Sequence, residues 1–229
     1  MQCMCKVFCF DLDDTLSKEI RYLESAYREI AQFAVSHSDG CSDQVSLSSK
    51  AYNIMLEAYH DGKNAFECLN EFLGLQLPVF EYLQMYHSHQ PKIELSTEVV
   101  DTLDNLKADG CVLGLISDGR SVQQRNKFNA LGLDKWLASD NIVISEEFGS
   151  EKPSLANYVY FMKKYPAATY IYVGDNPKKD FVGANELGWT TICLLDDGEN
   201  IHRQDFANIS EKYLPSYSIC NINELNNII

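Results

Sequence analysis

The spacing of hydrophobic residues along the chain changes after the first few residues and again near residue 91. A short apolar run at residues 7–10 predicts a buried strand. From about residue 20 to residue 86 the apolar residues recur at helical spacing, for example at Leu23, Tyr27 and Ile30. A stretch rich in Ser, Asp and Gly at residues 36–49 breaks this pattern. We therefore expect a block of several helices without strands.

After Pro91 short apolar runs alternate with helical patterns. Strands are expected at 111–116, 141–144, 169–173, 190–195 and 217–220, and helices at about 97–108, 122–131 and 179–187, after Pro153, and at the end of the sequence. Strands that alternate with helices pair in parallel, because a tight hairpin cannot join parallel neighbours. The sequence thus predicts an α/β fold with a Rossmann-like layered parallel-sheet core. We expect residues 1–16 and 92–229 to form this core, and residues 17–91 to be an all-helical domain inserted into it.

Charge composition narrows the possible partners. The 229 residues include 19 basic and 33 acidic side chains, for a net charge of −14. Nucleic acid and anionic membranes both require a basic surface, so neither is an expected partner. No obligate protein partner is inferred. If the substrate is anionic, the site must supply a local cation.

The eight cysteines form no C-x-x-C pair, and several lie inside apolar runs. We interpret them as reduced core residues of a cytoplasmic protein. Zinc binding by Cys3, Cys5 and Cys9 is disfavoured, because no second pair follows at zinc-finger spacing. No run of 18 apolar residues occurs, so neither a membrane span nor an export signal is expected. His87 and His89 lack a partner at metal-ligand spacing and are expected at the surface.

Polar side chains follow several of the predicted strands. Asp11 and Asp13 follow the first strand, Ser117 ends the second, Lys152 lies past the third, and Asp175 with Asp180 follows the fourth. In an open α/β sheet, ligands bind at the carboxyl ends of the strands. Asp and Thr also begin turns, so each position alone has a simpler interpretation. The set in this order favours an active site.

The residue types indicate phosphoryl chemistry. Clustered carboxylates repel, so some bind protons or a divalent cation lies among them, and oxygen ligands suit magnesium. Asp11 can act as a nucleophile and Asp13 can carry the proton of the leaving oxygen. Lys152 and Ser117 can stabilise the charge on a transferring phosphoryl group.

These residues resemble the four motifs of the haloacid dehalogenase-like (HAD) hydrolase superfamily. The motifs match Asp11-Leu-Asp13-Asp-Thr15, Ser117, Glu151-Lys152-Pro153, and Gly174-Asp175-Asn176 with Asp180. The resemblance implies Asp11 as nucleophile and Asp13 as acid and base. It also implies magnesium held by Asp11, Asp175 and the backbone carbonyl of Asp13.

The resemblance further implies which residues contact the substrate: Thr15, Ser117, Asp118, Gly119, Lys152 and Asn176. Asp118 departs from the family, which often has Asn there. Asn176 fits the turn before Pro177 equally well. Asp180 is interpreted as a supporting residue for Lys152 or the metal, although it also fits as a helix N-terminal acid.

The helical block resembles the cap that one subgroup of the family carries after its first motif. The expected function is a magnesium-dependent phosphatase that hydrolyses a small phosphorylated metabolite through an aspartyl-phosphate. Asp13 favours this over dehalogenation, since true dehalogenases lack that acid. A phosphomutase of the same superfamily is the main alternative. A phospho-accepting regulator is a weaker one, because receiver domains are about half as long and carry no cap.

Overall fold

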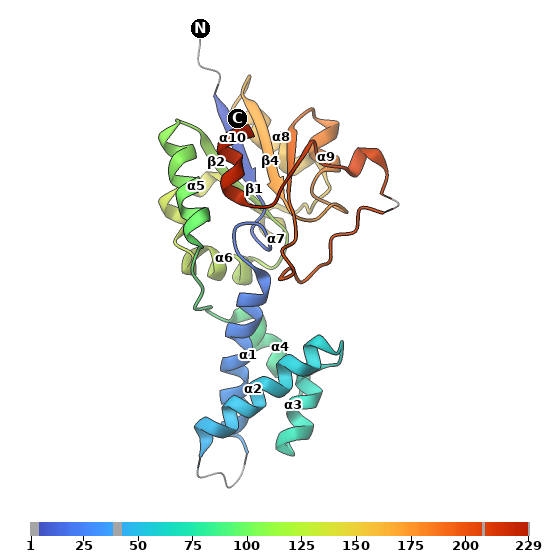
Figure 1. Cartoon of the computed structure of the whole chain (residues 1–229). Helices are drawn as coiled ribbons and strands as arrows, with labels where there is room; N and C mark the ends of the chain where they lie inside the picture. Colours follow the sequence, from blue (N-terminus) through green and yellow to red (C-terminus); the bar gives the residue numbers. More distant parts are fainter. Residues whose placement is uncertain (1–4, 39–42, 208, 229) are drawn as a thin grey trace. The chain divides into compact units, whose positions relative to one another are not determined.

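The computed structural model describes residues 5–38, 43–207 and 209–228. The chain divides into two compact units. One holds the residues up to Ile20 together with those from Glu94 onward, and the other is Arg21–Ile93. The first unit is α/β and the second is helical (Figure 1).

The α/β unit is built on one sheet of parallel strands, as predicted. In spatial order the strands are β3 (Ile142–Ile144), β2 (Val112–Ser117), β1 (Lys6–Phe10), β4 (Thr169–Gly174), β5 (Thr190–Leu194) and β6 (Tyr217–Ile219). β1 therefore pairs with β2 on one side and with β4 on the other. Its residues from Val7 to Phe10 are all buried, as expected for a parallel strand covered on both faces. The sequence order and pairing bring the ends of β1, β2 and β4 together.

The helices of this unit lie between the strands in sequence. They are α5 (Thr97–Ala108), α6 (Ser121–Ala130), α7 (Ser145–Phe148), α8 (Leu155–Lys164), α9 (Val182–Glu186) and α10 (Leu225–Ile228). Short 3-10 turns occur at Leu133–Lys135, Ser139–Asn141, Glu211–Tyr213 and Ile222–Glu224. The short helix α7 was not predicted, and α9 begins three residues later than the predicted start at 179. The delay arises because residues 176–180 form a turn, in which Asp180 N donates to Asn176 O.

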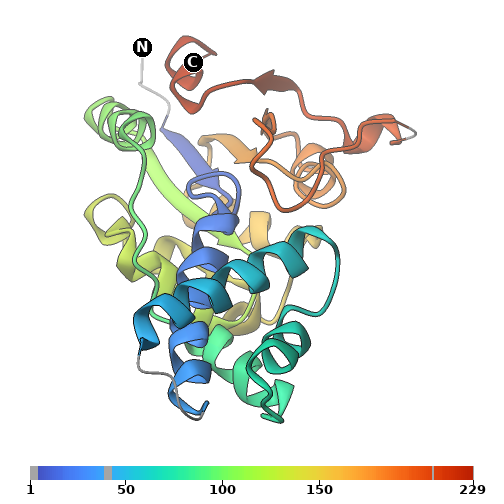
Figure 2. The same ribbon diagram turned by 60° about the horizontal axis from the view of Figure 1, so that its bottom comes forward.

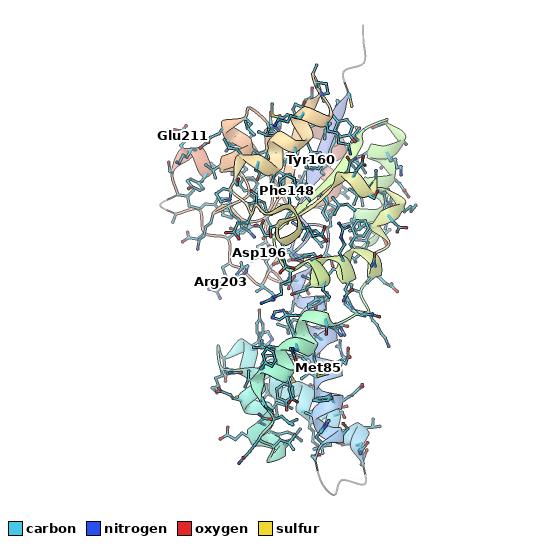
Figure 3. The ribbon with its side chains drawn as sticks, turned by 180° about the vertical axis from the view of Figure 1, so that it is seen from behind. Met85, Phe148, Tyr160, Asp196, Arg203 and Glu211 are labelled. Atoms are coloured by element: carbon cyan, nitrogen blue, oxygen red, sulfur yellow. The ribbon has the colours of Figure 1, made fainter. Side chains whose placement is uncertain are left out.

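Aromatic rings fill the space between the sheet and α8. The Tyr158 ring meets Tyr172 and Trp189 edge to face, with ring centroids 5.4 Å apart in each pair. Phe148 and Tyr160 form a further edge-to-face pair, labelled in Figure 3. The buried pairs made by Tyr158 add to the stabilisation that their burial supplies. The rings anchor α8, and with it the loop before it, on the sheet.

The helical unit contains α1 (Glu19–Ser36), α2 (Gln44–His60), α3 (Ala65–Leu73) and α4 (Val79–Ser88), shown in Figure 2. The first residues of α1 belong to the α/β unit. Asn64 caps α3 through its side-chain oxygen, and Gly74 ends this helix in the left-handed conformation. Strands are absent from the described part of this unit, as the hydrophobic pattern predicts.

His89 is buried, so the expectation that it lies at the surface was wrong. Its side chain is hydrogen-bonded to Ser25 at 2.8 Å and to Glu29. A pairing 60 or more residues apart has no local sequence pattern.

The described cysteines are free thiols. Cys9 and Cys193 are buried, whereas Cys5 and Cys220 are exposed, so only some of the described thiols are core residues. Cys3 and Cys41 lie outside the described residues. Among the described helices, none has the length and apolar character needed to cross a membrane.

Gly114 on β2 permits the close approach of α8. A Cβ atom at this position would lie 2.5 Å from the Phe161 ring. We expect Gly114→Ala to lower the free energy of unfolding by about 1–3 kcal/mol, the usual cost of overpacking a core, as measured by urea denaturation. The loss should shrink in a Phe161→Leu background, where the smaller side chain leaves room. Equal losses in both backgrounds would show that this contact is not the cause.

Candidate active site

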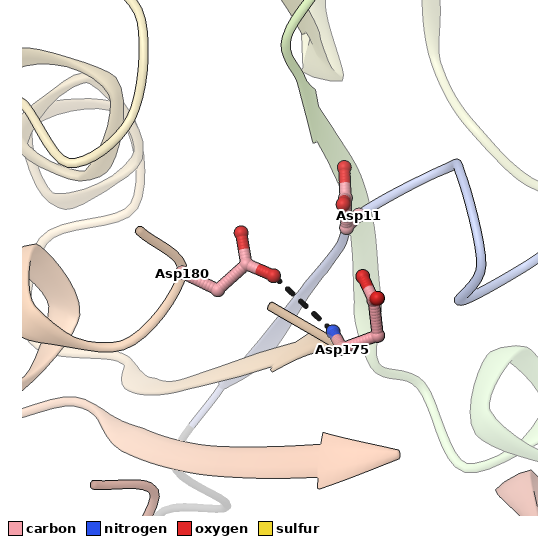
Figure 4. A group of neighbouring side chains, drawn as sticks. All are labelled: Asp11, Asp175 and Asp180. Atoms are coloured by element: carbon pink, nitrogen blue, oxygen red, sulfur yellow. Dashed lines mark hydrogen bonds between the residues drawn. The ribbon is translucent and has the colours of Figure 1, made fainter. Parts of the chain in front are cut away.

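The site lies at the carboxyl ends of the three central strands. Asp11 follows β1, Ser117 is the last residue of β2, and Asp175 follows β4. The Asp11 amide donates to Val173 O at 2.9 Å, which continues the strand pairing up to the site. Asp11, Asp175 and Asp180 lie together in Figure 4, and all three are buried. The sheet therefore brings together carboxylates that are far apart in the sequence.

Ionisation of all three carboxylates in the cluster is unfavourable, because three negative charges would lie close together. One oxygen from each of Asp11, Asp175 and Asp180 lies within 4.8 Å of the others. Burial raises the pKa of Asp11 to about 6, even though the Lys152 charge opposes it. Burial and the neighbouring charges of Asp11 and Asp180 raise the pKa of Asp175 to about 8. A cation among these oxygens would relieve the repulsion, and the all-oxygen donor set fits a hard divalent ion.

Asp180 differs from the other two because the protein already uses its oxygens. Its Oδ1 is 2.7 Å from Lys152 Nζ, and its Oδ2 accepts from the amides of Asp175 and Asn176 at 3.2 and 2.8 Å. Figure 4 shows the bond to the Asp175 amide. A Cβ on Gly174 would lie 2.6 Å from Asp180 Oδ2, so this glycine allows the approach. The contacts agree with a supporting function for Asp180 and leave Asp11 and Asp175 as the more available ligands.

Lys152 is the buried cation of the site. Its side chain is fully buried, and Nζ lies 2.9 Å from Asp11 Oδ1, 2.7 Å from Asp180 Oδ1 and 3.0 Å from the Tyr172 hydroxyl. Burial lowers the pKa of Lys152, but the charges of Asp11 and Asp180 outweigh this effect and hold it well above its usual value. The ammonium is therefore charged and fixed next to one oxygen of Asp11.

Two buried hydroxyl groups have no hydrogen-bond partner among the described residues. They are Ser117 Oγ and Thr15 Oγ1. A buried hydroxyl without a partner is costly, and a ligand oxygen would satisfy it. Both residues were predicted to contact the substrate, and both retain an unused donor.

Asp13 has different partners from Asp11. Its Oδ1 lies 2.7 Å from Lys127 Nζ, and its Oδ2 accepts from Gln124 Nε2 at 2.9 Å. Burial alone would raise the pKa of Asp13, but the Lys127 charge and these hydrogen bonds lower it to about 2. In this arrangement Asp13 is an anion.

The remaining predicted residues are engaged by the protein itself. Asp118 accepts from the Lys152 amide at 3.0 Å and pairs with Lys179 Nζ at 3.1 Å. The Gly119 amide donates to Ser145 Oγ at 2.9 Å. Asn176 Oδ1 accepts from the Lys178 amide at 3.0 Å, a contact typical of the turn expected there. Substrate contacts by Asp118, Gly119 and Asn176 stay predictions.

A loop after β5 supports the cluster and was not anticipated. Asn200 Nδ2 donates to Asp175 Oδ2 at 3.3 Å, and Gln204 Nε2 donates to Asp175 O at 2.7 Å. Lys18 binds Asn200 Oδ1 and Asp197, each at 2.7 Å. Asp196 and Arg203, labelled in Figure 3, lie in this loop. It has no periodic pattern that would have placed it beside Asp175.

Other residues at the site were missed although weak signals were present. Gln124 and Lys127 stand three residues apart on the helix after the second motif, so they share a face. Tyr172 places a hydroxyl group between the apolar residues Ile171 and Val173, two residues before Gly174. Lys179 directly precedes Asp180. None of these signals says which distant side chain each residue meets.

The parallel sheet, the acidic cluster at its strand ends and the buried lysine define a protein of the α/β class with an oxygen-rich site suited to a divalent metal. The chain belongs to the haloacid dehalogenase-like hydrolase family, whose model matches residues 8–194. The family resemblance drawn from the four motifs is thereby confirmed.

The chain is also similar to proteins that are named as phosphatases or HAD-hydrolases. The chain is 29% identical over 231 residues to a glyceraldehyde 3-phosphate phosphatase of Methanocaldococcus jannaschii, covering 99% of this chain and 97% of the relative. It is 27% identical to the protein of that name from Methanothermobacter thermautotrophicus, covering 87% and 91%. A HAD-hydrolase of Bacillus subtilis, YfnB, solved bound to magnesium, has the same fold, with a TM-score of 0.65, 20% identity and 98% coverage of both chains. The family and the relatives support a phosphoric monoester hydrolase.

Lys152 and Lys179 form a matched pair for testing the buried charge. Lys152→Met leaves Asp11 and Asp180 without their cation, and we expect a loss of about 3–5 kcal/mol in the free energy of unfolding. Lys179→Met should lose at most about 1 kcal/mol, because Lys179 and Asp118 are partly exposed. Both are measured by urea denaturation in the presence of a metal chelator. Similar losses for the two variants would contradict the assigned difference.

Proposed function

We propose that the protein is a magnesium-dependent phosphatase that hydrolyses a small phosphate monoester through an aspartyl-phosphate on Asp11. One observation carries this proposal: Asp11 has one oxygen held 2.9 Å from the buried Lys152 ammonium, at the same sheet edge as the unpartnered Ser117 hydroxyl. This arrangement combines a nucleophile, a cation and a hydrogen-bond donor. Those are the groups that phosphoryl transfer requires.

In the first step Asp11 attacks phosphorus. Its Oδ1 is held by Lys152, so the other carboxylate oxygen forms the new bond to phosphorus while the bond to the leaving oxygen breaks. Lys152 and Ser117 bind the phosphoryl oxygens, on which negative charge is spread in the transition state. Thr15 adds a second hydroxyl donor near the first motif.

Asp13 moves the protons of the reaction. It first takes up a proton from solvent and donates this proton to the leaving oxygen in the first step. In the second step it takes a proton from the water that attacks phosphorus and releases Asp11 and inorganic phosphate. The lowered pKa of Asp13, to about 2, favours the anion, which is the form that accepts a proton from water.

The metal in this proposal is held by carboxylate oxygens of Asp11 and Asp175 and by the backbone carbonyl of Asp13, with Asp180 as support. Burial and neighbouring carboxylates raise the pKa values of Asp11 and Asp175, so a cation bound here would stabilise both as anions. When bound, the ion would screen the charge of Asp11 from an incoming phosphate.

Glyceraldehyde 3-phosphate is the substrate we propose to test first. The support is the name carried by relatives that match 99% and 87% of the chain. The helical unit, Arg21–Ile93, is proposed to be the family's cap, which would contribute to the choice of substrate. A cytoplasmic site of action is part of the proposal, supported by the free thiols.

A panel of phosphate esters tests the activity and the nucleophile together. We expect phosphate release from glyceraldehyde 3-phosphate or another small ester in a panel with phosphoglycolate, sugar phosphates and nucleotides. Asp11→Asn should lower this release by at least about 10³-fold, as loss of a nucleophile does. Asp101→Asn, an exposed acid on α5, is the control and should remain active.

Two outcomes would contradict this proposal. An isomerised sugar phosphate formed without free phosphate would identify a phosphomutase. A phosphorylated protein that is stable for minutes and does not turn over would identify a phospho-accepting regulator.

Metal removal tests the acidic cluster. Dialysis against a chelator should abolish phosphate release, and Mg²⁺ should restore it, because the substrate would otherwise meet an uncompensated group of carboxylates. Mn²⁺ binding, followed by electron paramagnetic resonance, should be at least tenfold weaker in Asp175→Asn, since this change removes a charged oxygen ligand. Full activity in protein shown to be metal-free would contradict the assignment.

A further inference from the structure

Helix α6 carries two buried polar side chains that both reach Asp13. Gln124 and Lys127 are three residues apart, and their side chains are 3% and 2% exposed. They lie more than 110 residues after Asp13 in the sequence. A lysine buried this completely is rare unless it is paired, so the position of its charge requires an explanation.

Each of the two side chains binds one oxygen of the Asp13 carboxylate, which is also in contact with the Glu19 side chain. Lys127 Nζ binds Oδ1 at 2.7 Å, and Gln124 Nε2 donates to Oδ2 at 2.9 Å. Gln124 Nε2 also donates to Asp118 O at 3.1 Å, and Lys127 also pairs with Glu19. Each carboxylate oxygen thus has its own donor from one rigid helix, and this fixes the rotation of the carboxylate.

The neighbouring backbone is shaped to allow this contact. Gly119, with φ +146°, lies so close to Gln124 that a Cβ atom would be 2.6 Å from Nε2. A side chain at position 119 would therefore displace Gln124 from Asp13. The second-motif loop and α6 together form the support of Asp13.

Stability alone does not account for this arrangement. Buried ion pairs add little to stability compared with apolar side chains of similar size, because both charges lose their hydration. The Asp13 side chain is 26% exposed whereas the Lys127 side chain is 2% exposed, so the carboxylate is supported from the inside while part of its surface stays open. A support of this kind suits a group that must exchange a proton at a defined place.

We propose that Gln124 and Lys127 are positioning residues that hold the Asp13 carboxyl group where it meets the leaving oxygen of the substrate. The inference rests on the phosphatase function proposed above. In the step concerned, the Asp11 to phosphorus bond forms, the phosphorus to leaving-oxygen bond breaks, and a proton that Asp13 has taken up from solvent passes to that oxygen. Neither positioning residue touches the substrate. Both act through Asp13.

Leaving-group dependence distinguishes this function from a structural one. An alkyl phosphate needs its leaving oxygen protonated, whereas p-nitrophenyl phosphate leaves as a stable anion. Loss of a general acid lowers rates by about 10²–10⁴-fold. We therefore expect Lys127→Met to lower kcat at least tenfold more for the best alkyl ester of the panel than for p-nitrophenyl phosphate. Gln124→Ala should show the same pattern to a smaller degree, and it leaves no charge unpaired.

A double variant tests whether Lys127 acts through Asp13. In an Asp13→Asn background, adding Lys127→Met should change kcat for the alkyl ester less than twofold. Glu19→Gln combined with Lys127→Met serves where the single variant fails to fold, because it removes the carboxyl group that loses its lysine. Its reference is Glu19→Gln alone, since Glu19 also contacts Asp13. Lys163→Met, an exposed lysine on α8, is the control.

Two results would overturn the inference alone: equal losses of kcat for both esters, or a full further loss on adding Lys127→Met to Asp13→Asn. Absence of wild-type activity on every ester would instead overturn the proposed function, and this inference with it. The wild-type assay therefore separates the two failures.

Discussion

The ammonium group of Lys152, buried between Asp11 and Asp180, is the interaction on which the site depends. Without it two buried carboxylates would face each other, and burial already raises the pKa of Asp11. Tyr172 and the Asp118 carboxylate hold the lysine from either end, at Nζ and at its backbone amide. Strand β4, the second-motif loop and the third-motif loop thus meet at one cation. A nucleophile next to a fixed positive charge follows from this packing.

Two further sets of polar contacts support the carboxylates, one at Asp180 and one at Asp175. Asp180 joins Lys152 to the backbone amides that precede Pro177, so the fourth-motif turn is tied to the cation. The loop after β5 adds amide donors to Asp175. Buried carboxylates without such partners would bind protons and lose the charge that a metal requires. The acidic cluster is therefore built from its supports as much as from its own side chains.

Hydrophobic spacing predicted the parallel sheet because strands buried on both faces are continuously apolar, as at residues 7–10, and it predicted the helical insertion because apolar residues recur there at helical spacing. Position at a strand end likewise marked Asp11, Ser117 and Asp175 as candidate site residues. The partners of Asp13 could not be predicted, because Lys127 reaches it across more than 110 residues and helix α6 has no strongly apolar face to orient it. His89 escaped prediction for the same reason. The local sequence pattern predicts the helix or strand in which a residue lies. Contacts between side chains that are distant in the sequence depend instead on how the helices and strands pack.

The pair of Asp118 and Lys179 has a consequence for how this sequence can vary. Asp118 stands where the family often has Asn, and its added charge is matched by Lys179 at 3.1 Å. Replacing Asp118 by a neutral residue would remove the carboxylate that pairs with Lys179. Lys179 would then lie near Lys152, and the positive charge of Lys152 disfavours a positive charge on Lys179. Replacing Lys179 would leave an extra anion next to the phosphate site. Each single exchange passes through a less favourable intermediate, so the two positions are expected to change together over evolution, and relatives with Asn at the first should lack a lysine at the second.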